Sequence, residues 1–128
     1  FKEYTDNFEF RFVDPRLLRE SEKKIFNLTE SIFALIGGKP SKVKEIRISE
    51  TMRKELGVLF DTVGVWDPGN GWIIIKRTQL NCMVDYAGTL LHETVHAMSG
   101  TSDVSRAFES ELTKVIGLIV SKIYQKHF

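Results

Sequence analysis

Apolar and charged residues alternate at the start of the chain, over residues 8–13, and this period of two predicts a β-strand. Asp14 and Pro15 follow, a pair suited to a helix start, since Asp caps the first turn and Pro fits its first position. From residue 16 to about 36 the apolar positions recur every three or four residues, which predicts a long N-terminal helix. The two glycines at 37–38 end it.

Three further segments predict strands. Residues 43–48 alternate in polarity, residues 63–66 form a short apolar run, and residues 72–76 form the strongest strand pattern of the chain. The turn-forming residues at 67–71 separate the last two runs and predict a hairpin. Residues 50–60 have no clear period and fit a short helix at best.

Two helices are predicted for the rest of the chain. The first covers residues 80–98, and its apolar face consists of Val84, Ala87, Leu91, Val95 and Met98. Residues 99–103 break the pattern, and a second helix is predicted over residues 104–124. Because the break is short, the second helix should turn back antiparallel to the first. The predicted fold class is therefore α+β: a long N-terminal helix, a sheet of three or four strands, then two antiparallel helices.

Composition and charge narrow the possible functions. The chain has 128 residues, 42% hydrophobic and 27% charged, so residues 1–128 are expected to form a single domain. Lys and Arg total 18 against 17 Asp and Glu, a balance that gives no support for nucleic-acid or membrane binding. No apolar run approaches a membrane span. Because the chain begins at Phe1 rather than Met, we expect it to be excised from a longer protein.

Cysteine usage gives a weaker indication of location. Cys82 is the only cysteine, which excludes an intrachain disulfide and favours a cytoplasmic protein. We expect its side chain to be buried as a small apolar group rather than exposed as a reactive thiol.

The motif His92-Glu93-Thr94-Val95-His96 dominates the candidate chemistry. It lies within the helix predicted over residues 80–98, where residues four apart share one face. Two imidazoles in this arrangement can bind one Zn²⁺, and Glu93 can act as the general base on a water molecule. Asp85 and Thr89 fall on the same face as the histidines.

A catalytic zinc usually has three protein ligands, so a third is needed beside His92 and His96. From the rise per residue, Glu109 in the next helix lies nearly level with the motif, and Glu111 slightly further along. Asp103 is a rival for which a helix N-cap is the simpler role. We therefore predict Glu109 as the third metal ligand, ahead of Glu111 and Asp103.

The strings Leu-Leu-His-Glu-Thr-Val-His-Ala (90–97) and Asp-Val-Ser-Arg-Ala-Phe-Glu (103–109) resemble gluzincin zinc metallopeptidases, in particular small bacterial metallopeptidase-like domains. Some of those domains are fused behind ATPase modules of the GHKL type. The resemblance covers roughly residues 60–120 and implies a minimal zincin-like fold. In such enzymes an exposed strand precedes the motif helix, and residues 72–76 would be that strand here. The gap between the motif and Glu109 is shorter than in well-known gluzincins.

The predicted function is a zinc-dependent metallopeptidase that hydrolyses peptide bonds of a peptide or protein substrate, with one Zn²⁺ as its cofactor. Glu93 would take a proton from water and deliver it to the leaving amine. The candidates for stabilising the oxyanion are Tyr86, Arg106 and Tyr124. With few loops to form an enclosed pocket, specificity is expected to come from a fused or partner regulatory domain.

Two other functions fit the same residues. One is a non-catalytic regulatory or interaction domain with a structural or vestigial metal site. The other is a zinc hydrolase of a non-peptide substrate. Trp66 and Trp72 flank the predicted hairpin turn, where they could line a substrate groove or cover the edge of the core.

Overall fold

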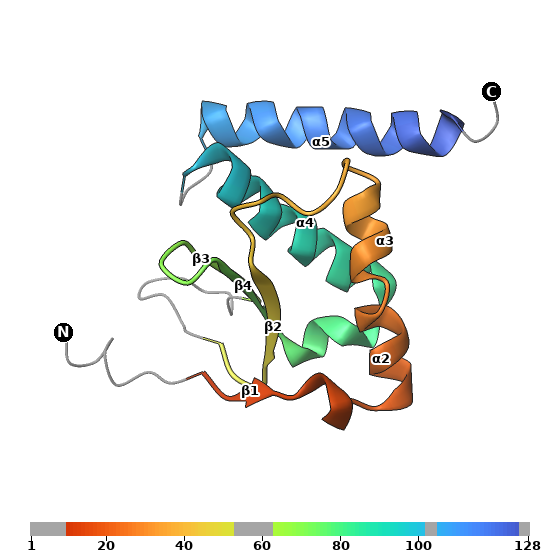
Figure 1. Ribbon diagram of the computed structural model, residues 1–128, viewed down its shortest axis with the longest axis vertical. Helices are drawn as coiled ribbons and strands as arrows, with labels where there is room; N and C mark the ends of the chain where they lie inside the picture. Colours follow the sequence, from red (N-terminus) through yellow and green to blue (C-terminus); the bar gives the residue numbers. More distant parts are fainter. Residues whose placement is uncertain (1–9, 53–62, 102–104, 126–128) are drawn as a thin grey trace.

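A computed structural model describes residues 10–52, 63–101 and 105–125 of the chain. Helices pack against a mixed sheet (Figure 1), in agreement with the predicted α+β class at this level. The sheet is built from β1 (Phe12–Val13), β2 (Glu45–Ser49), β3 (Gly64–Asp67) and β4 (Trp72–Lys76). Their order across the sheet is β1-β2-β4-β3, so β4 is an interior strand and β3 is an edge strand of the described part.

The pairing of the strands combines both directions. β2 and β4 are parallel, whereas β1 pairs antiparallel with β2 and β3 pairs antiparallel with β4. The predicted hairpin is confirmed, because Asp67 pairs with Trp72 and the Gly71 amide donates to the Asp67 carbonyl at 2.9 Å. Gly71 has a φ of +74° and packs against the segment before β2, a position that only glycine suits.

The expectation that residues 72–76 form the exposed strand is wrong. Ile73, Ile74 and Ile75 are all buried, and β4 has a hydrogen-bonded neighbour on each side. A run of three isoleucines presents apolar side chains to both faces of a sheet, which suits an interior strand. Among the described strands, β3 is the edge strand next to the motif helix.

The prediction of a single long helix over residues 16–36 is also wrong. This part of the chain forms three shorter elements: η1 (Pro15–Leu17), α2 (Glu20–Phe26) and α3 (Thr29–Ala34). Side chains explain both breaks. The Glu22 carboxylate accepts from the Arg19 amide at 2.8 Å, which starts α2 afresh. The Thr29 hydroxyl bonds the Phe26 carbonyl at 2.5 Å and lies 2.6 Å from the Tyr86 hydroxyl, so the chain turns between α2 and α3.

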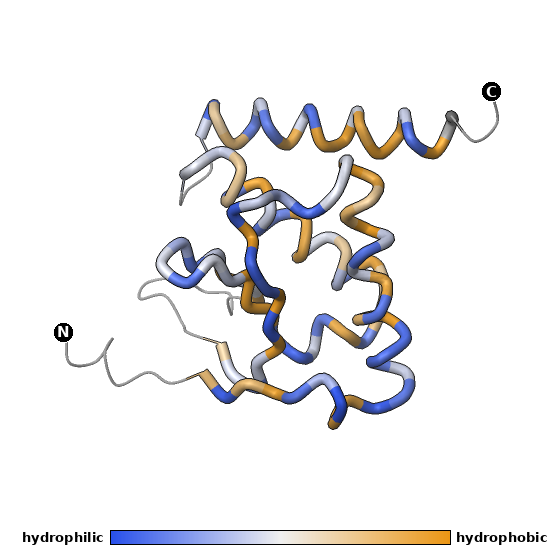
Figure 2. Tube along the Cα trace, viewed as in Figure 1, coloured by the Kyte–Doolittle hydropathy of each residue, from blue (hydrophilic) through white to orange (hydrophobic). Residues whose placement is uncertain are grey.

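The two C-terminal helices are confirmed as α4 (Met83–Ser99) and α5 (Arg106–Gln125). The start of the predicted first helix forms instead the 3₁₀ helix η2 (Arg77–Asn81). α4 ends at Gly100, whose φ of +71° and bond to the His96 carbonyl form a left-handed cap. α5 then returns across α4 with its hydrophobic side largely towards the protein body (Figures 1 and 2).

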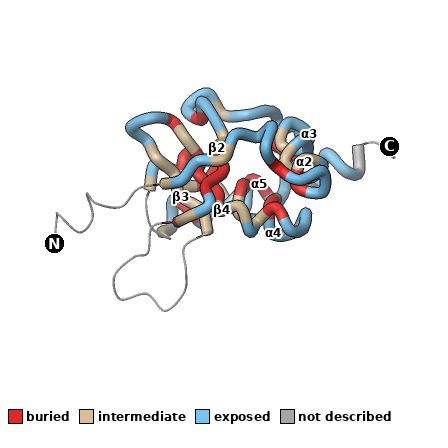
Figure 3. Tube along the Cα trace, turned by 90° about the horizontal axis from the view of Figure 1, so that it is seen from below, coloured by how far each residue is buried: buried red, intermediate tan, exposed pale blue. Residues whose placement is uncertain are grey.

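The core lies where the sheet meets the helices (Figure 3). Its members come from every layer, with side chains almost fully removed from solvent: Phe33, Val43, Ile48, Ile73, Ile75, Leu80, Tyr86, Leu90, Val95 and Val115. α4 is central because its residues contact both the sheet and α5. None of the helices in the described ranges is long and apolar enough to cross a membrane.

Some sequence predictions fall wholly or partly on residues that the structure does not describe. The strand predicted over residues 8–13 is described only from residue 10, and β1 covers its last two residues. The short helix considered for residues 50–60 lies mostly outside the described ranges.

One buried ion pair joins α2 to the segment before the motif helix. Two nitrogens of Arg77 donate to the two Glu22 oxygens, each at 2.9 Å, and Arg77 also pairs with Glu50. The Glu22 side chain is only 6% exposed. Hydrogen bonds from Arg77 lower the pKa of Glu22 to about 2, against the opposing effect of burial.

This pair predicts a pH dependence of stability. A carboxylate with a lowered pKa in the folded state stabilises the protein above its unfolded value of 4.5, and this contribution is lost as the pH falls towards 2. Glu22→Gln should therefore lower the free energy of unfolding by on the order of 2 kcal/mol near neutral pH and by much less near pH 2. Urea unfolding at several pH values measures this difference. Glu20→Gln, at an exposed position of the same helix, is the control and should show little effect; an equal loss at every pH for Glu22→Gln would contradict the prediction.

Candidate metal centre

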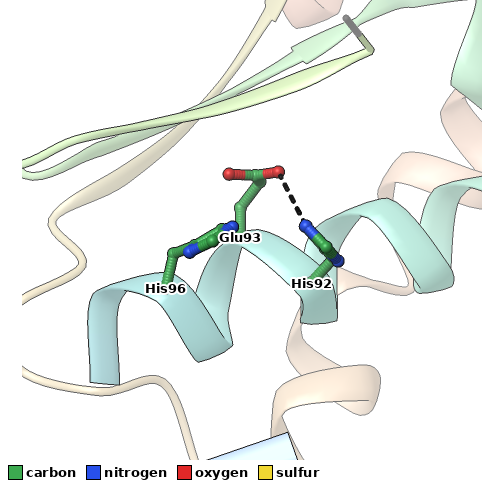
Figure 4. A group of neighbouring side chains, drawn as sticks. All are labelled: His92, Glu93 and His96. Atoms are coloured by element: carbon green, nitrogen blue, oxygen red, sulfur yellow. Dashed lines mark ion pairs between the residues drawn. The ribbon is translucent and has the colours of Figure 1, made fainter. Parts of the chain in front are cut away.

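Helix α4 brings three side chains of the motif together at one point (Figure 4). One ligand atom each of His92, Glu93 and His96 lies within 4.8 Å of the others, and the two imidazole centroids are 4.9 Å apart. The helical register accounts for the histidines, since residues four apart stack on one face. Among the His, Cys, Asp and Glu residues that the structure describes, these three lie close enough together to hold a metal ion.

The hydrogen bond of His96 fixes which nitrogen is available. His96 Nδ1 lies 2.9 Å from the Thr101 carbonyl oxygen. Because a carbonyl only accepts, Nδ1 must carry the proton, which leaves the Nε2 lone pair free. Metal-binding histidines are commonly oriented by such a bond. The chain just after the left-handed cap at Gly100 supplies this carbonyl.

His92 is the more accessible imidazole, with about half of its side chain exposed. Partial burial, and then the proximity of His96, lower the pKa of His92. Its neutral form, which is the form that can bind a metal, therefore persists to lower pH than in a free histidine. His92 Nε2 lies 4.0 Å from Glu93 Oε2 (Figure 4).

Glu93 lies between the motif helix and the edge strand. Its side chain is only 10% exposed, and it points from α4 towards β3. A Cβ placed on Gly64 of β3 would be 3.1 Å from Glu93 Cγ and 3.3 Å from Oε2. The carboxylate is thus packed directly against the backbone of the strand.

A groove of about 1060 Å³ runs along this junction of β3 and α4. β3 contributes Gly64, Val65 and Trp66, and α4 contributes His92, Glu93 and His96 together with Asp85 and Thr89. The placement of Asp85 and Thr89 beside the histidines is therefore confirmed. Trp72 lies elsewhere in the sheet, where the Arg47 guanidinium stands 4.6 Å from its ring centroid.

An aromatic side chain of α5 packs against both imidazoles. The Phe108 ring centroid lies 5.1 Å from that of His92 and 4.6 Å from that of His96, and Phe108 is 3% exposed. This ring covers one side of both imidazoles and limits their rotation.

The predicted third ligand lies outside this group. Glu109 is exposed and Glu111 is half-buried, and neither belongs to the group formed by His92, Glu93 and His96. Since Phe108 faces the imidazoles, Glu109 is turned about 100° away around α5. Asp103 lies outside the described residues. The third ligand therefore stays a prediction.

The structure narrows the candidates for an oxyanion donor. Tyr86 is fully buried, bonds Thr29 and does not line the groove, and its burial raises its pKa to about 12. Arg106 is exposed on α5, and the side chain of Tyr124 is outside the described part.

One residue that lines the groove was not anticipated from the sequence. Gln79 in η2 lines it and bonds the Thr89 hydroxyl at 2.8 Å, which orients the amide group. No pattern in the sequence indicates Gln79, since η2 has no periodicity of its own. The expectation that Cys82 is buried is wrong, because its side chain is exposed. Cys82 is the N-cap residue of α4, so it lies before the first helical turn and outside the buried face of the helix.

No protein-family model, no curated protein and no solved structure matches this chain. The resemblance to gluzincins therefore depends on the motif and its neighbouring residues alone, and the function has to be argued from the geometry of the groove.

The third-ligand prediction can be tested by zinc affinity. Loss of a direct ligand should weaken zinc binding by more than the roughly 10- to 100-fold that follows loss of an outer hydrogen-bond partner. We expect this result for Glu109→Ala, with smaller changes for Glu111→Ala and Asp103→Ala, measured by competition with a chromogenic chelator. A larger effect of Glu111→Ala or Asp103→Ala would move the third ligand to that residue.

Proposed function

We propose that this chain is a zinc-dependent metallopeptidase of the gluzincin type. The observation that supports it best is that His92, Glu93 and His96 lie together and line a groove beside the edge strand β3. Two candidate metal ligands, a nearby carboxylate and a strand edge are three of the parts that hydrolysis of an extended peptide needs.

The donor set fits zinc. Two imidazole nitrogens on one face of a helix are typical zinc ligands, and the bond from His96 to the Thr101 carbonyl leaves Nε2 free for the metal. His92 and His96 would hold the ion, with Glu109 as the predicted third ligand. Bound zinc would supply a Lewis acid that polarises a carbonyl and makes water acidic.

Glu93 is placed to act as the general base. It lies close to both histidines but on the side towards β3, so it can face a substrate that lies in the groove. In the proposed mechanism Glu93 accepts a proton from the attacking water and then donates it to the leaving amine. Because the carboxylate is largely buried, little solvent competes for that proton.

The edge of β3 offers a template for the substrate. The Val63 carbonyl accepts from the Lys76 amide, so in the alternating pattern of an antiparallel pair Gly64 and Trp66 direct their backbone groups away from β4. An extended peptide could add to this edge by main-chain hydrogen bonds. Its backbone would then pass over Glu93 and the histidines, which favours a peptide over a non-peptide substrate.

A non-catalytic domain with a structural or vestigial metal site is the second candidate. It is favoured by the placement of Glu109 outside the motif group, since a site with two ligands binds zinc weakly. The two functions differ in whether Glu93 has a role, because a structural site has no use for a base.

The test of the proposal is Glu93→Gln, which keeps the size of the side chain and removes the base. Zinc content should stay unchanged, while cleavage of fluorescein-labelled casein by the zinc-loaded protein should fall by at least about 100-fold. Glu45→Gln, an exposed position on β2, is the matched control and should keep full activity. Undiminished cleavage by Glu93→Gln would refute the mechanism, and a wild-type chain that binds zinc without cleaving any peptide would favour the non-catalytic domain.

A further inference from the structure

Gly64 occupies a strand position where glycine is otherwise unfavourable. It is the first residue of β3, a place where a side chain would normally add packing and β-propensity. Its backbone does not require glycine, because the glycines with a positive φ are Gly37, Gly38, Gly71 and Gly100. The reason for glycine at this site must therefore be space rather than conformation.

The space is taken by the motif helix. A Cβ on Gly64 would lie 2.6 Å from Thr89 Cγ2, closer than real carbon atoms approach, and 3.1 Å from Glu93 Cγ. Thr89 cannot simply rotate away, because its hydroxyl is bonded to Gln79 Oε1 at 2.8 Å. The methyl group of Thr89 thus fills the position that a side chain at Gly64 would need.

We propose that Gly64 is a positioning residue for the general base: the missing side chain lets β3 lie directly on α4 and fixes the Glu93 carboxylate at the strand edge. Thr89 contributes to this positioning as well, because the bond to Gln79 holds its methyl group in the space beside Gly64. The inference rests on the proposed peptidase function and extends it, because it names what sets the distance between the base and a substrate bound along β3. Any side chain at residue 64 would widen this junction or push Glu93 towards the histidines.

The experiment is a double-mutant cycle of Gly64→Ala and Thr89→Ser in the zinc-loaded chain. Thr89→Ser removes the Cγ2 methyl that the new Cβ would meet and keeps the hydroxyl that bonds Gln79. With a quenched fluorogenic peptide as substrate, Gly64→Ala should lower kcat on the order of 10- to 100-fold with a smaller change in KM. Its zinc content should stay at the wild-type level, since neither histidine is touched. The double variant should recover most of the lost kcat.

A second readout does not depend on activity. Gly64→Ala should lower the urea midpoint of unfolding, and addition of Thr89→Ser should raise it again. Gly117→Ala, on α5 with nothing near its added Cβ, is the matched control and should keep wild-type kcat with an equal or higher midpoint.

The outcomes separate this inference from the proposed function. If Gly64→Ala keeps wild-type kcat, or loses stability but not kcat, Gly64 is no positioning residue although the peptidase assignment stands. If the double variant is no better than Gly64→Ala, the contact with Thr89 is not the cause and the inference is wrong. If the wild-type chain itself neither binds zinc nor cleaves peptides, the proposed function is wrong, and the inference that depends on it is wrong as well.

Discussion

The packing of α4 against the sheet is the constraint on which the site depends. Tyr86, Leu90 and Ala97 bury one face of this helix in the core cluster, which also contains Ile73 and Ile75 of β4. This contact fixes the rotation of α4, and the neighbouring face with the two histidines must then lie beside the edge of the sheet. Glu93, between these two faces, is directed at β3.

The other contacts of the site orient the side chains of α4 once the helix is packed on the sheet. The left-handed turn at Gly100 brings the Thr101 carbonyl to His96, and the Phe108 ring of α5 covers both imidazoles. The absence of a side chain at Gly64 lets the strand approach closely. A helix that was rotated by one residue would lose its contacts with Phe108 of α5 and with Gly64 of β3.

Much of this fold follows from periodicity in the sequence. The motif helix, α5, the hairpin and strand β4 were predicted close to their observed limits, because each has a regular apolar pattern or strong turn residues. The breaks after residues 17 and 26 were missed, since they depend on the side chains of Glu22 and Thr29 forming bonds to the backbone and to distant residues. Periodicity contains no information on such bonds.

The site was predicted less completely than the fold. Helical spacing places His92, Glu93 and His96 together without any knowledge of tertiary structure. The choice of Glu109 used the rise along α5, but the rotation of that helix depends on which residue packs on the imidazoles, and Phe108 does so. Periodicity also could not show that residues 72–76 form an interior strand, because strand order in a sheet is decided by contacts between segments far apart in the chain.

The central claim is that His92 and His96 hold one zinc ion, and elemental analysis of the purified chain tests it most directly. The measurement compares the wild-type chain with a His92→Ala/His96→Ala variant after both have been supplied with zinc and dialysed. The account predicts close to one zinc per wild-type chain and almost none in the variant. Absence of zinc from the wild-type chain, or equal zinc in both proteins, would contradict it.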